Sequence, residues 1–134
     1  MKQTIRPIPG VPIDVVAVFL FALVGKVFHD RLPIAALGTV QGWIEVFTVA
    51  FPFMLATFIG WAGLMLRQYY ALFPGGLVVW ACTEILGMMF RFMNHQEVNL
   101  AFVLTSALFL AILLFGWRLI AWPLLSRHPK EATA

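Results

Sequence analysis

Apolar residues occupy four long, nearly continuous segments of this chain, separated by short polar or Pro- and Gly-containing connections. A helix needs roughly 20 residues to cross the apolar core of a bilayer, and continuous apolar runs favour helices over alternating outer-membrane strands. The pattern therefore predicts an all-α membrane protein with four transmembrane helices, over about 12–31, 43–67, 75–93 and 99–122. Short connections make consecutive helices antiparallel neighbours. We expect a single four-helix transmembrane domain over residues 1–134, with a polar tail at 124–134.

Composition supports a membrane location. The chain is 62% hydrophobic and 11% charged, whereas a soluble domain carries about 25% charged residues. Cys82 is the only cysteine, which excludes an intrachain disulfide. The net charge of +3 does not indicate a nucleic-acid partner, because the basic residues lie mostly at the ends of apolar runs.

The basic residues predict the orientation of the helices, because cytoplasmic ends are enriched in Lys and Arg. With four spans, both termini share a side with the connection between the second and third helices. That side carries Lys2, Arg6, Arg67, Arg118, Arg127 and Lys130, and the opposite side carries Lys26, Arg31 and Arg91. We expect a multi-pass membrane protein with both termini cytoplasmic.

Polar residues within the apolar segments are the candidate functional positions, because a charge at the bilayer centre costs roughly 2.5 kcal/mol or more. They are Asp14, Lys26, His29, Glu45, Thr83, Glu84 and Arg91. Asp14 follows Pro12, so it fits the first helical turn as an acid beside the positive end of the helix dipole. Lys26 fits an anchor at a helix end, and Glu45 fits an acid near a helix start. A buried functional carboxylate remains the alternative for Asp14.

Glu84 and Arg91 lack such a simple account. Glu84 is predicted near mid-membrane, and Arg91 lies two turns further along nearly the same face. We expect Arg91 to meet acids at the outer side, namely Glu45, Asp30 or Glu97. Glu84 then either reaches toward that cluster or is protonated, as an isolated buried carboxyl group often is. A structural role and a titrating or ligand-binding role both remain open.

Small residues and one proline indicate how the helices pack. Small side chains let helix backbones approach closely in lipid, and a proline bends a helix. The predicted packing positions are Gly25, Pro52, Gly60 and Gly87.

Catalytic motifs are not evident. We find no Ser–His–acid spacing, no Gly-rich phosphate loop and no cluster with metal-ligand spacing. The sequence therefore predicts no catalytic residues, no metal site and no cofactor.

Spaced Gly, Trp, Pro, His and Arg residues in "VGKVFH", "FPF", "GW", "PGGLVVWACTEILGMMFR" and "GWR" resemble a family of small bacterial membrane proteins, domain of unknown function 3054. The resemblance covers about residues 12–120. The matching positions are Asp14, Gly25, His29, Pro52, Phe53, Gly60, Trp61, Trp80, Thr83, Gly87, Arg91, Gly116, Trp117 and Arg118. It implies a four-span, multi-pass protein of the bacterial plasma (inner) membrane and no particular activity. Glu45 and Glu84 depart from the family pattern, which favours Asp14, His29, Thr83 and Arg91 as functional candidates.

Together these features predict a non-enzymatic integral membrane protein, an accessory or assembly subunit of a membrane complex or a homo-oligomer. Its expected partners are the lipid bilayer and other membrane subunits or copies of itself. The alternative is a small ion- or proton-coupled transporter working as an oligomer, with Asp14, His29, Glu84 and Arg91 in the path. A lipid-acting enzyme with His29 as base, and Thr39 or Thr48 as nucleophile, is the third hypothesis.

Overall fold

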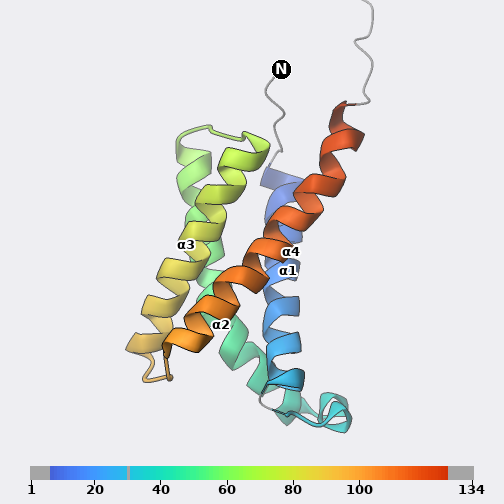
Figure 1. Cartoon of the computed structure of the whole chain (residues 1–134), viewed down its shortest axis with the longest axis vertical. Coiled ribbons are helices and arrows are strands. Elements are labelled where there is room, and N and C mark those ends of the chain that lie inside the picture. Colours follow the sequence, from blue (N-terminus) through green and yellow to red (C-terminus); the bar gives the residue numbers. More distant parts are fainter. Residues whose placement is uncertain (1–6, 30, 127–134) are drawn as a thin grey trace, which may run out of the picture.

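The computed structural model describes residues 7–29 and 31–126, and within them the chain forms four α-helices and one short 3₁₀ helix (Figure 1). The elements are α1 Pro7–Phe28, η1 Ile34–Gly38, α2 Val40–Leu66, α3 Leu72–Met93 and α4 Leu100–Ser126. Each α-helix is long and apolar enough to cross a membrane. No strand occurs in the part of the chain that the structure describes. The predicted class, an all-α membrane protein with four spans, is confirmed.

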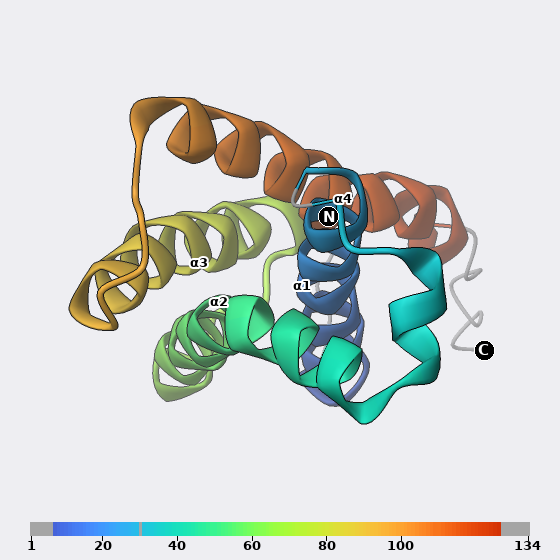
Figure 2. The same ribbon diagram turned by 90° about the horizontal axis from the view of Figure 1, so that it is seen from below.

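The helices form a ring in chain order. α1 packs on α2, α2 on α3 and α3 on α4, and α4 returns to α1 (Figure 2). The start of α1, the α2–α3 connection and the end of α4 lie at one end of the bundle, which we call the terminal end (Figure 1). η1 and the α3–α4 connection lie at the other end, the loop end. That the terminal end faces the cytoplasm stays a prediction.

The first helix begins earlier than predicted. α1 starts at Pro7, where a missing backbone N–H costs nothing because first-turn N–H groups have no helical acceptor. Pro12, the predicted start, lies inside the helix, and no acid occupies the first turn. The interpretation of Asp14 as a first-turn acid is therefore wrong. The helix also ends at Phe28, before the predicted 31, and Arg31 has a left-handed φ of 53°.

The other boundaries also move by a few residues. Thr39 caps α2, accepting a hydrogen bond from the Gly42 amide at 3.1 Å. α3 begins at Leu72, so Pro74 lies within its first turn instead of preceding it. α4 continues to Ser126, so the predicted tail is wrong for 124–126, and 127–134 lie outside the described residues.

Two glycines bring α2 and α3 close together. A Cβ on Gly60 would lie 3.3 Å from the Val79 Cα, and one on Gly87 would lie 2.5 Å from the Phe53 ring. The fully buried Phe53 also meets Phe21 of α1 edge-on, with ring centroids 5.2 Å apart. Only a hydrogen at position 87 leaves room for the Phe53 ring, which links three helices of the core.

The other predicted packing positions behave differently. Pro52 is buried inside α2, and the helix continues past it. Gly25 has no neighbouring atom within 4 Å of the position its Cβ would take. Among the described residues, Gly25 therefore does not make the predicted helix contact and borders a pocket instead.

Candidate functional site

Asp14 is the centre of a buried polar cluster at the terminal end. Arg118 Nη1 and Nη2 donate to Asp14 Oδ1 and Oδ2, both at 2.7 Å. The indole Nε1 atoms of Trp117 and Trp61 donate to the same two oxygens, both at 2.8 Å. Asp14 and Arg118 are fully buried. We call these four residues the Asp14 cluster.

Two glycines leave space for this cluster. A Cβ on Gly76 of α3 would lie 2.7 Å from Arg118 Nε, and one on Gly10 of α1 would lie 2.5 Å from the Trp61 ring. The cluster therefore draws on all four helices. A bidentate contact with a guanidinium group, together with two further hydrogen-bond donors, stabilises a carboxylate in apolar surroundings. This arrangement favours the structural interpretation of Asp14, with a partner other than the helix dipole.

The sequence prediction placed Arg118 among the basic residues of the cytoplasmic side and among the family matches, but not among the candidate functional positions. Arg118 and Asp14 are 104 residues apart, so no helical spacing connects them. The sequence does contain a signal for this pair: an acid in the first span and a base in the last. Because unpaired charges in a span are costly, such residues are expected to pair.

Two smaller polar contacts join α3 to its neighbours. The hydroxyls of Thr83 and Thr57 are 2.9 Å apart and both buried. Because Thr57 donates its proton to the Phe53 carbonyl at 2.8 Å, Thr83 is the donor between the two hydroxyls. Glu84 accepts a hydrogen bond from Ser106 of α4 at 2.8 Å. Neither Thr83 nor Glu84 lines the pocket, though Ser106 does.

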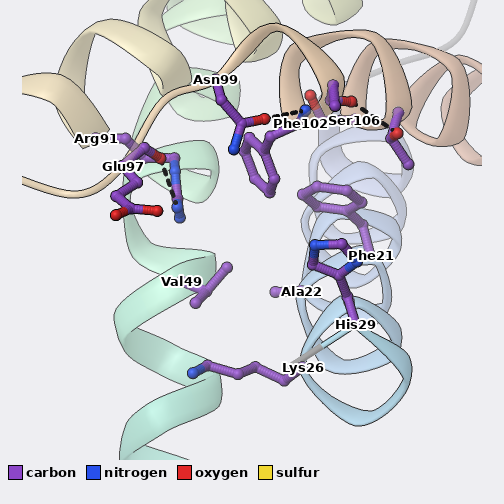
Figure 3. A pocket seen from close by; sticks show the side chains of 13 residues that line it. Phe21, Ala22, Lys26, His29, Val49, Arg91, Glu97, Asn99, Phe102 and Ser106 are labelled. Carbon is purple, nitrogen blue, oxygen red and sulfur yellow. Dashed lines mark hydrogen bonds between the residues drawn. The ribbon is translucent and has the colours of Figure 1, made fainter. Parts of the chain in front are cut away.

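A pocket of about 390 Å³ opens at the loop end, and we call it the loop-end pocket. Its polar lining comes from the ends of α1 and α3 and the beginning of α4. Figure 3 shows Lys26, His29 and Arg91 on different sides of it. The lining residues are Phe21, Ala22, Gly25, Lys26, His29, Val49, Arg91, Glu97, Asn99, Ala101, Phe102, Thr105 and Ser106.

Two basic side chains of the pocket make contacts with neighbouring residues, Arg91 within the pocket wall and Lys26 with a residue outside it. Arg91 is only 9% exposed; its Nη2 donates to the Glu97 carbonyl at 3.3 Å, and its Cζ lies 4.4 Å from the Phe102 ring centroid. Lys26 Nζ lies 3.8 Å from a Glu45 carboxylate oxygen. We expected Arg91 to meet one of three acids, but its hydrogen bond to Glu97 is to the main-chain carbonyl, and the half-buried Glu45 lies beside Lys26 instead. Asp30, the third predicted acid, lies outside the described residues.

The predicted candidates therefore lie in three places, because Thr83 and Glu84 make the helix contacts described above and do not line the pocket. Lys26, His29 and Arg91 meet at the loop-end pocket, and Glu45 lies beside it through Lys26. Asp14 belongs to the opposite end of the bundle. Within the described residues, no three His, Cys, Asp or Glu side chains are grouped so as to hold a metal ion.

Comparison with known proteins identifies one family. No curated protein and no solved structure matches the chain. The family described as "Protein of unknown function (DUF3054)" matches residues 11–121, which cover the four spans almost completely. The chain belongs to this family of proteins of unknown function.

Proposed function

We propose that this membrane protein is a non-enzymatic accessory or assembly subunit that associates, with its own copies or with other membrane proteins, through the outer face of α4. The observation that carries the proposal is a gap at Gly116 in a row of exposed side chains on that face, which we call the notch. Leu104, Leu108 and Ile112 are exposed at intervals of four residues, and Gly116 continues the row. Such a row forms a ridge along one side of a helix.

Gly116 interrupts this ridge, and no atom of the described residues lies within 4 Å of the position its Cβ would take. Elsewhere in the bundle, Gly60, Gly76 and Gly87 each make room for a neighbouring backbone or side chain. A glycine in a span typically lets another helix approach, and none of the described helices approaches Gly116. In addition, only 17% of the α4 span is buried within the bundle.

The test is self-association or partner capture in a mild detergent. We expect the purified chain to migrate as a defined oligomer or with a stoichiometric partner, and Gly116→Leu to reduce that species several-fold by filling the notch. Gly63→Leu is the matched control, because Gly63 of α2 is also open on its outer side. A monomer without a partner, or equal loss in both variants, would contradict the proposal.

One observation favours transport as a second candidate function. The loop-end pocket is open at one end of the bundle, whereas the Asp14 cluster joins α1, α2 and α4 at the other. Carriers expose a binding site to one side while the other side is closed. This candidate predicts pH-dependent ion flux in liposomes that Arg91→Ala abolishes. Ion flux equal to that of liposomes without the protein would contradict the transport function.

A further inference from the structure

The loop-end pocket combines basic and apolar walls at two different depths. Lys26 lies two residues before the end of the first span at Phe28, and Arg91 lies two residues before the end of the third at Met93. At 1.5 Å of rise per residue, both Cα atoms lie about 3 Å inside the span ends. This is the level at which lipid phosphates meet the hydrocarbon region.

The deeper wall of the pocket is largely apolar. Phe21 lies seven residues before the end of its span, about 10 Å inside it, and Ala22 and Val49 also line the cavity. Phe102 stacks under the Arg91 guanidinium and continues this surface from α4. A ligand that fills the whole pocket therefore needs a charged group at the span end and an apolar group below it.

The pocket also opens sideways between α1 and α4. Ala101 and Thr105 line it and are exposed on the outer surface of α4. Gly25 on the α1 side has open space next to it. All three residues lie within the apolar spans, so the opening faces the lipid phase. A molecule already in the membrane can enter without crossing water.

The charge of the lining favours an anion. Among the described lining residues, Lys26, Arg91 and His29 are basic, against one carboxylate, that of Glu97. Glu97 is exposed at the rim, and Glu45 approaches Lys26 from outside the pocket. An arginine and a lysine at the same depth are the side chains that bind phosphate oxygens in membrane pockets.

We propose that the loop-end pocket binds the phosphate-bearing headgroup of an anionic membrane lipid, with an acyl chain lying in the opening between α1 and α4. Arg91 and Lys26 hold the phosphate, and Phe21 and Phe102 pack against the upper part of the chain. This site does not depend on the association of α4 proposed above, and it commits to a lipid as the source of the phosphate.

The experiment is competition between lipids for the purified full chain, read by native mass spectrometry. The protein is equilibrated in detergent with equal amounts of phosphatidylglycerol and phosphatidylcholine. We expect phosphatidylglycerol to be retained about fivefold or more over phosphatidylcholine. Lys26→Gln is expected to lower this preference about fivefold, the effect of about 1 kcal/mol for one basic residue at a membrane surface.

Arg31→Gln is the matched control, because Arg31 is an exposed cation at the same end that does not line the pocket. It should leave the preference unchanged. Arg91→Gln should act like Lys26→Gln, and if it unfolds in detergent, the partly exposed Lys26 still provides the test. Equal retention of the two lipids would overturn the proposal, as would an equal effect of Arg31→Gln.

A second arm distinguishes a lipid from a soluble anion. Inorganic phosphate at millimolar concentration is added to the protein with bound phosphatidylglycerol. If the acyl chain contributes to binding, the lipid should remain bound. Complete displacement by phosphate alone would assign the pocket to a soluble anion and overturn the lipid assignment.

Discussion

The carboxylate of Asp14 accepts four hydrogen bonds, two of them from Arg118, whereas Arg118 Nε is buried without a hydrogen-bond partner among the described residues. A buried ion pair is worth little compared with a well-packed apolar pair, but loss of one partner leaves an uncompensated charge. Replacing one of the two residues should therefore destabilise the bundle more than replacing both with apolar residues.

We therefore expect Asp14→Asn to destabilise the protein by about 3–5 kcal/mol, because it leaves the Arg118 guanidinium buried without its counter-charge. The double variant Asp14→Leu/Arg118→Met removes both charges and should recover much of this loss. Thermal unfolding in detergent, followed by tryptophan fluorescence, measures both. A double variant less stable than Asp14→Asn would contradict this account of the pair.

At the scale of helices, packing depends on where the glycines face. Gly87 faces the Phe53 ring, Gly60 faces the backbone of α3, and Gly25, Gly63 and Gly116 face open space. The same residue type thus has opposite structural roles, and a helical spacing pattern alone does not distinguish them. This is why the sequence prediction misplaced Gly25.

Substitution by alanine should separate the two classes. Gly87→Ala places a methyl group against the fully buried Phe53 ring, and we expect a loss of about 1–3 kcal/mol from overpacking. Gly63→Ala meets no atom and should stabilise the helix by about 0.5–1 kcal/mol. Denaturation midpoints of the two variants, compared in the same detergent, test the difference. Similar shifts of the same sign would show that space at the glycine does not decide stability.

At the scale of the whole molecule, apolar run length was enough to predict the four spans, because a helix that crosses a bilayer must be continuous and apolar. Helix ends were less predictable. Both Pro7 and Pro12 fit a helix start, and only the structure shows that α1 begins at Pro7.

The candidate site was predicted in part. Lys26, His29 and Arg91 were recognised as costly polar residues, and antiparallel topology places the ends of α1 and α3 at one end of the bundle. Ser106 and Phe102 were not recognised, because a serine and a phenylalanine in an apolar helix are unremarkable. The partnership of Asp14 with Arg118 was missed, since it depends on how the first and last helices meet.

The orientation of the bundle in the membrane can be tested directly. After Cys82→Ala, a cysteine is introduced at Gln68 in the α2–α3 connection or at Ala35 in η1, both exposed. If the terminal end is cytoplasmic, a membrane-impermeant maleimide should label Ala35→Cys in right-side-out vesicles and Gln68→Cys in inside-out vesicles. The reverse labelling would invert the predicted topology.

The pairing of Asp14 with Arg118 also has a consequence for biogenesis. A ribosome completes the first helix long before the fourth, so Asp14 enters the bilayer about a hundred residues ahead of its guanidinium partner. Until α4 arrives, the nascent chain carries an uncompensated carboxylate in its first span. We expect a chain cut short before Arg118 to keep the unpaired carboxylate and to be less stable in the membrane than the full chain.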